Sequence, residues 1–185
     1  MKRINFLLLV IIEFFFKEAQ GQETMTDDRD GKVYKTVTIA GKIWMAQNLA
    51  YAKEEIGEPS KDNYILCYDD SIENCNKYGM LYSWKAARAA CPNGWHLPTK
   101  ADVDSLLGEI NSDESKKKAF NITYAGWAHF SYLNRYVFKD KIGTLLTSIE
   151  GKNPPYRMVF HKSSNKIRVL DGYEMNGWSV RCVKE

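Results

Sequence analysis

Four cysteines, Cys67, Cys75, Cys91 and Cys182, constrain the fold of this 185-residue chain more than any other feature. They form an even set in a chain that begins like an exported protein, so we expect them to form disulfides in an oxidising compartment. Three connectivities are possible, and we favour the pairing of sequence neighbours, which joins Cys67 to Cys75 and Cys91 to Cys182. The cysteine spacing lacks the C-x-x-C pairs of structural zinc sites, so the sequence predicts no metal site.

Residues 1–21 have the pattern of a cleaved export signal. Lys2 and Arg3 precede an apolar run over residues 4–12, and the small residues expected before a cleavage point end at Gly21. An uncleaved anchor is the alternative, but the run is shorter than the ~20 residues that span a bilayer. We therefore expect a secreted, periplasmic or cell-surface protein, with no membrane span once the signal is removed.

The rest of the chain is long enough for one domain of ordinary size. We place this domain at residues 33–185, after a short polar lead-in at residues 22–32. Hydrophobic residues make up 44% of the chain and aromatic residues 13%, which predicts a folded core rather than a disordered chain. The net charge of +3 is too small to indicate a nucleic-acid partner.

Hydrophobic periodicity divides the domain into three parts. Alternating apolar residues on both sides of a turn predict a strand pair over residues 33–46. Helical spacing then predicts two helices, one over residues 81–90 and one that begins after Thr99. Period-two patterns predict a final antiparallel meander, with strands at residues 145–146, 156–160, 167–170 and 178–183. This order of elements belongs to the α+β class.

The second helix has a clear start signal. The Thr99 hydroxyl can cap the first backbone amides, and Asp102 three residues later completes a pattern like a capping box. Val103, Leu106 and Leu107 then supply the apolar face of the helix. His96 lies just before this helix in a Trp-His-Leu-Pro turn, where we expect it to make a structural hydrogen bond.

Aromatic residues of the second half supply the candidate binding surface. Exposed aromatic rings can stack on the faces of sugars without the help of calcium. We select Trp127, Tyr132 and Arg135 as candidate ligand contacts. Three other tryptophans fall on periodic or motif positions and are predicted to be core residues: Trp44, Trp84 and Trp95.

Several sequence blocks follow one another in order along the chain. They are Trp44-Met45-Ala46-Gln47-Asn48-Leu49, Cys67-Tyr68-Asp69-Asp70, Leu81-Tyr82-Ser83-Trp84, Cys91-Pro92-Asn93-Gly94-Trp95-His96-Leu97-Pro98 and Val180-Arg181-Cys182-Val183. Over roughly residues 27–185, the chain resembles the Fibrobacter succinogenes major paralogous domain, a family of secreted proteins of Bacteroidetes and Fibrobacteres. The resemblance implies a C-type-lectin-like fold and a disulfide between Cys91 and Cys182, in agreement with the favoured pairing.

The resemblance implies no particular activity, and the chain has no nucleophile elbow, H-E-x-x-H metal motif or phosphate-binding glycine loop. We therefore expect a non-enzymatic binding domain without a cofactor, whose ligand is a glycan or a protein. One alternative is a structural or adhesive surface module that binds no small ligand. The other is a degenerate relative of the formylglycine-generating enzymes, which share the lectin-like fold and would need a free thiol.

Overall fold

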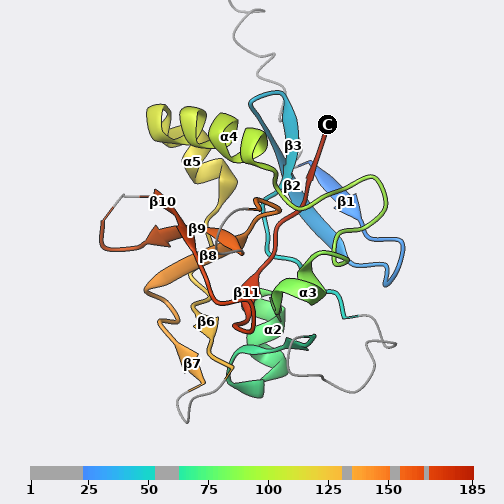
Figure 1. Cartoon of the computed structure of the whole chain (residues 1–185). Coiled ribbons are helices and arrows are strands. Elements are labelled where there is room, and N and C mark those ends of the chain that lie inside the picture. The colour runs from blue at the N-terminus through green and yellow to red at the C-terminus, as the bar shows by residue number, and fades with distance from the viewer. Residues whose placement is uncertain (1–22, 53–62, 131–134, 151–154, 165–166) are drawn as a thin grey trace, which may run out of the picture.

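A computed structural model of the chain describes residues 23–52, 63–130, 135–150, 155–164 and 167–185 (Figure 1). The expected export signal at residues 1–21 lies outside this part. The predicted strand pair is present as β2 (Val33–Ile39) and β3 (Lys42–Met45), which pair antiparallel. Ala40 and Gly41 join them with φ angles of 53° and 74°. A two-residue hairpin turn needs positive φ angles so that its twist matches the right-handed twist of the two strands.

Two further strands extend this pair into a four-stranded sheet, with the order β1-β2-β3-β12. β1 (Thr24–Thr26) comes from the segment predicted as a polar lead-in, so part of that segment belongs to the sheet. β12 (Val183–Lys184) brings the end of the chain beside β3. Both ends of the described chain therefore lie in the same sheet.

A second sheet has six strands in the order β10-β9-β8-β11-β5-β4. The strands are β4 (Ile65–Leu66), β5 (Leu81–Tyr82), β8 (Ile142–Leu146), β9 (Tyr156–His161), β10 (Ile167–Asp171) and β11 (Trp178–Ser179). The predicted meander is confirmed for β8, β9 and β10, which pair antiparallel in sequence order. It is wrong for β11, which runs parallel to β8 and antiparallel to β5. β6 (Trp127–Ala128) and β7 (Tyr136–Val137) form a separate small hairpin.

The helices are short except for α4 (Lys100–Ser112), whose predicted start is confirmed. Thr99 and Asp102 form the reciprocal capping box there. The described chain also contains η1 (Tyr68–Asp70), α2 (Ile72–Tyr78), α3 (Trp84–Ala87) and α5 (Glu114–Phe120). The fold is of the α+β class, as predicted. Among the described residues, no helix is long and apolar enough to cross a bilayer.

The helix predicted over residues 81–90 is largely wrong. Leu81 and Tyr82 are strand residues, because they pair with β11 on one side and β4 on the other. The Ser83 side chain then accepts a hydrogen bond from the Ala86 amide, which starts α3 two residues after the strand. The apolar spacing that suggested one helix is therefore divided between a buried strand and one helical turn.

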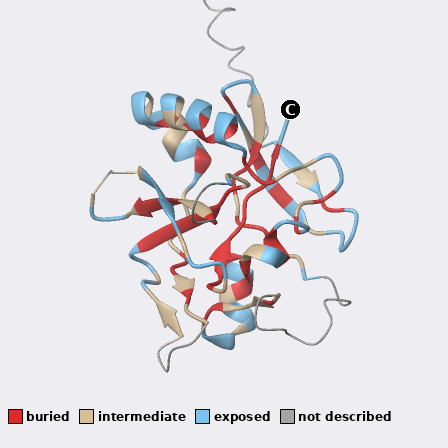
Figure 2. Ribbon diagram, in the orientation of Figure 1, coloured by how far each residue is buried: buried red, intermediate tan, exposed pale blue. Residues whose placement is uncertain are grey.

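The core has two main clusters of buried apolar residues, which run through β8, β9 and β2 (Figure 2). One face of α4 covers the second cluster with Val103, Leu106 and Ile110, each at most 1% exposed. Leu107, predicted on the same face, is partly buried against this cluster. The apolar face predicted for this helix is confirmed. The packing of this face on the core also fixes the position of the segment that precedes α4.

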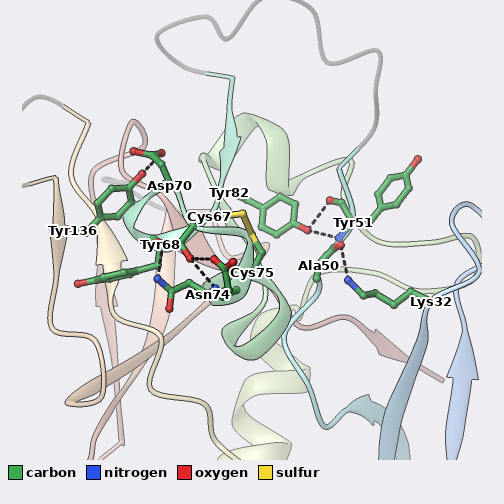
Figure 3. The surroundings of a disulfide bond; sticks show 12 residues. Lys32, Ala50, Tyr51, Cys67, Tyr68, Asp70, Asn74, Cys75, Tyr82 and Tyr136 are labelled. Carbon is green, nitrogen blue, oxygen red and sulfur yellow. Dashed lines mark hydrogen bonds between the residues drawn. A yellow bond between two sulfur atoms is a disulfide. The ribbon is translucent and has the colours of Figure 1, made fainter.

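Both favoured disulfides are present, and all four cysteines are paired. Cys67–Cys75 links the residue before η1 to α2, and the Asn74 side chain donates to the Tyr68 carbonyl oxygen at 2.8 Å beside it (Figure 3). Cys91–Cys182 ties the end of the α3 region to the last strands. The C-terminal segment is thereby fixed to the turn that leads into α4.

A buried arginine locks the same C-terminal segment. Arg181 is 1% exposed, and its guanidinium donates to Asn48 Oδ1 at 2.9 Å and to the carbonyl oxygens of Phe120 and Asn121. These carbonyls are free because α5 has ended. Burial lowers the pKa of Arg181 to about 9. The side chain joins the N-terminal part, α5 and the chain end at one point.

Candidate ligand-binding site

The segment between α3 and α4 is a rigid turn that presents Trp95. Within this segment, Cys91 is covalently bonded to Cys182. At its other end, the His96 amide donates to the Val183 carbonyl oxygen at 2.9 Å, and the Val183 amide returns a bond of the same length to His96. Trp95 therefore lies between two fixed points of the backbone, and its side chain is partly buried against the first core cluster.

A polar cluster behind this turn braces it against α4. Asp102 is 1% exposed, and its Oδ2 lies 2.8 Å from the Thr99 amide nitrogen and 3.1 Å from His96 Nε2. Lys42 Nζ lies 2.8 Å from Asp102 Oδ1 and 2.5 Å from Glu185 Oε1. Burial alone would raise the pKa of Asp102, but the contacts with Lys42, Thr99 and His96 hold it well below its usual range. The structural hydrogen bond predicted for His96 is confirmed.

The same cluster has the composition of a metal site. His96, Asp102 and Glu185 each offer one ligand atom, and these atoms lie within 4.8 Å of one another. The Lys42 ammonium, however, already contacts both carboxylates and supplies the positive charge that a cation would bring. The donor set therefore fits a structural ion-pair network better than a metal centre.

Trp95 borders two hollows in the surface. The first, which we call the β1 hollow, has a volume of about 570 Å³ and lies between β1, β2 and the turn. Thr24, Thr26 and Thr38 are exposed residues of its strand wall, and Asn93 is exposed on the turn. Hydroxyl and amide groups thus line the hollow together with charged residues of both signs, which include Glu23, Asp28, Arg29 and Lys184.

The second hollow, which we call the α3 hollow, has a volume of about 410 Å³. Trp84, partly buried at the start of α3, lines it together with Trp95. Arg88 and Glu150 are exposed on its rim and carry opposite charges. Ser148 holds the far wall in place through its amide, which donates to the Pro98 carbonyl oxygen at 2.8 Å. We refer to the two hollows together as the Trp95 groove.

The groove combines aromatic surface with hydrogen-bonding groups. An indole face is electron-rich and attracts the polarised C–H groups on the apolar side of a pyranose ring. The threonine hydroxyls, Asn93, Arg88 and Glu150 can bind the hydroxyl groups of such a ring. Because the lining is polar and carries charges of both signs, the chemistry fits a hydroxyl-rich chain better than a purely apolar ligand.

The core assignment of three tryptophans was only partly right. Trp44 is 1% exposed and packs edge-on against Phe120, as expected for a core residue. Trp84 and Trp95 are partly buried: they pack against the first core cluster on one side and line the groove on the other. The sequence did carry a signal for this difference, because Trp95 follows Pro92, Asn93 and Gly94 in a turn, where side chains are rarely fully enclosed.

Of the three selected contacts, the structure describes Trp127 and Arg135. Trp127 packs against Phe138 at 4.8 Å and against Trp178 at 5.5 Å between ring centroids, both at small interplanar angles. These neighbours leave little of its face for a ligand. Arg135 is partly buried directly before β7, and Tyr132 lies outside the described residues. A ligand site at Trp127, Tyr132 and Arg135 stays a prediction.

Residues 37–116 match the family model of the Fibrobacter succinogenes major domain. The matched stretch contains Trp84, Cys91 and Trp95, and with them most of the α3 hollow and part of the β1 hollow. No curated protein and no solved structure matches the chain significantly. The family resemblance seen in the sequence is confirmed for this stretch.

Proposed function

Because residues 37–116 are a Fibrobacter succinogenes major domain, we propose that the protein is an extracytoplasmic, non-enzymatic module that binds a saccharide chain in the Trp95 groove. The observation that carries the proposal is the position of Trp95, whose indole borders both hollows. One sugar unit stacks on the indole, and its neighbours in the chain extend into the hollow on either side. The two disulfides fit an extracytoplasmic protein.

The proposed architecture is C-type-lectin-like, and the proposed binding needs no calcium. Supporting this, the groove offers hydroxyl, amide and guanidinium groups that can bind sugar hydroxyls directly. The groove also favours a binding module over a purely structural one, since a structural module has no need of an aromatic residue between two hollows. All four cysteines are in disulfides, which leaves no thiol for chemistry of the formylglycine-generating type.

The first test is a glycan-array screen of the full chain with both disulfides formed, run in calcium and again in chelator. We expect binding under both conditions. Trp95→Ala should weaken binding at least about tenfold, because central aromatic contacts contribute about 2 kcal/mol or more to such interfaces. Tyr173→Ala, at a ring that is 54% exposed outside the groove, is the matched control and should leave binding unchanged.

Three results would contradict the proposal. If no glycan on the array binds under either condition, a saccharide ligand is ruled out and a protein ligand is favoured. Binding that Trp127→Ala abolishes and Trp95→Ala spares would move the site to the residues selected from the sequence. Binding that chelator abolishes would replace the groove with a calcium-dependent site. Circular dichroism of each variant shows whether the fold is retained.

A further inference from the structure

A third hollow, which we call the β7 hollow, lies away from the Trp95 groove. It has a volume of about 590 Å³ and is formed by the turn from β7 into β8 and by the end of β9. Figure 1 shows β7 at the lower left of the molecule, whereas the yellow-green segment that carries Trp95 lies at the right. A volume of this size suits a small organic ligand. The β7 hollow is therefore large enough for a ligand of its own.

Phe138 forms the apolar wall of the β7 hollow in an unusual conformation. Its φ angle is 64°, in the left-handed region that bulky residues rarely adopt, and its side chain is 48% exposed. Such a conformation costs about 1–2 kcal/mol for a residue with a Cβ. The amides of Lys141 and Ile142 both donate to the Phe138 carbonyl oxygen, at 3.1 and 3.0 Å, and keep the turn in this shape.

A glycine makes this turn possible. The backbone of residues 137–139 passes so close to Gly126 that a Cβ there would lie 2.2 Å from the Val137 carbonyl oxygen. The same turn stacks the Phe138 ring on Trp127 at 4.8 Å. The surrounding structure thus holds an aromatic ring at the surface at an energetic cost, a pattern found where backbone strain accompanies function.

The rim of the β7 hollow is positively charged. Lys141 and Lys162 are exposed and adjacent, since the Lys162 amide donates to the Lys141 carbonyl oxygen at 3.0 Å. Within the part of the chain that the structure describes, neither lysine has a carboxylate within ion-pair distance. The carboxylate of Asp140, also in the turn, accepts a hydrogen bond from the Tyr78 hydroxyl at 2.9 Å. Lys141 and Lys162 therefore line the hollow together with Phe138 and Ile142, and Lys162 Nζ lies 5.7 Å from the centroid of the Tyr124 ring.

From this combination we propose that the β7 hollow binds a small aryl carboxylate. The aromatic body of the ligand packs on Phe138 and Ile142, and its carboxylate lies between Lys141 and Lys162. A neutral aryl compound would leave Lys141 and Lys162 without a carboxylate partner, since the contact of Lys162 Nζ is with the Tyr124 ring, 5.7 Å from its centroid. A carboxylate without a ring would lose the apolar contact. This site is independent of saccharide binding, since it shares no residue with the Trp95 groove.

The test uses 2-naphthoate and its uncharged isostere 2-naphthamide as probes, with isothermal titration calorimetry on the full chain. For a ligand of this size we expect a dissociation constant for 2-naphthoate of about 0.1–1 mM. The amide should bind at least about fivefold more weakly at low salt. Equal affinities for the two probes would overturn the proposed charge recognition.

Three variants locate the site. Phe138→Gly should weaken both probes at least about fivefold without unfolding the protein, because glycine adopts a φ of 64° freely. Lys141→Gln combined with Lys162→Gln should weaken 2-naphthoate and leave 2-naphthamide unchanged. Lys100→Gln, at a lysine whose side chain is 73% exposed on α4, removes a charge elsewhere and should change neither affinity.

The outcomes separate this proposal from that of the groove. If Phe138→Gly and the unmodified chain bind 2-naphthoate with equal affinity, the β7 hollow is not the site and the proposal fails. Trp95→Ala should leave 2-naphthoate binding intact, and Phe138→Gly should leave glycan binding intact. Loss of 2-naphthoate binding in Trp95→Ala would place the aryl ligand in the groove and would equally overturn the β7 site.

Discussion

The two disulfides close loops of very different length, and their removal should therefore have unequal effects on stability. Cys91 and Cys182 are 91 residues apart, whereas Cys67 and Cys75 are 8 apart. We expect the C91A/C182A variant to lose much more free energy of unfolding than the C67A/C75A variant. The two loops do not overlap in the sequence, so each loss can be assigned to its own loop.

The expected magnitudes follow from the entropy that each bond removes from the unfolded chain. In the chain-entropy model, the 91-residue separation corresponds to about 4.6 kcal/mol and the 8-residue separation to about 2.5 kcal/mol at 25 °C. The lost packing is closely matched, because each pair joins one fully buried and one partly buried cysteine. The difference of about 2 kcal/mol therefore reports loop length rather than cavity size.

The assay is urea unfolding under non-reducing conditions, followed by far-UV circular dichroism. Linear extrapolation gives the free energy of unfolding of each variant in water. Because domains of this size are stable by only about 5–15 kcal/mol, the C91A/C182A variant should lose a large part of its stability. If C67A/C75A lost as much as or more than C91A/C182A, the entropic reasoning would be refuted.

Two further predictions concern the braced turn and the β7 hollow. Since Asp102 has a pKa below that of an unfolded carboxyl, its stabilisation is present above the unfolded pKa and is lost as the pH falls toward the folded one. Asp102→Asn should therefore lower the free energy of unfolding by about 2 kcal/mol at pH 7. In urea titrations, the difference in unfolding free energy between the variant and the unmodified chain should shrink between pH 4 and 2. A difference that stays constant would contradict the assignment. Gly126→Ala should destabilise the protein by at least about 2 kcal/mol more than Gly31→Ala, which has a similar positive φ but open space around it. Equal losses in thermal or urea unfolding would show that the close approach to Val137 is unimportant.

Local signals in the sequence predicted the elements that depend on local interactions. The strand pair at residues 33–46 follows from alternating apolar residues and a two-residue turn. The start of α4 follows from Thr99 and Asp102, whose side chains and backbones bond to each other within one turn. The same residues reach Lys42 and His96, however, and nothing in local spacing indicates those partners.

Features that depend on distant pairing were missed. Leu81 and Tyr82 have a spacing typical of a helix, yet β4 and β11 recruit them into a sheet. Trp95 was predicted to be a core residue because it falls on a motif position, whereas the disulfide and the bonds to Val183 hold it at the edge of the core, where it is partly buried. The groove could not be predicted, because β1 and residues 148–150 reach Trp95 only through the tertiary fold.

The central position of β11 has a consequence for how the protein matures. This strand is the only link in the six-stranded order between β8 and β5, so the two halves of the sheet stay separate until residues 178–179 arrive. Arg181 and Cys182 follow at once and complete the buried contacts of α5 and the long disulfide. The six-stranded sheet therefore cannot be completed before residues 178–182 are available, and a chain that lacks them exposes unpaired strand edges that favour aggregation.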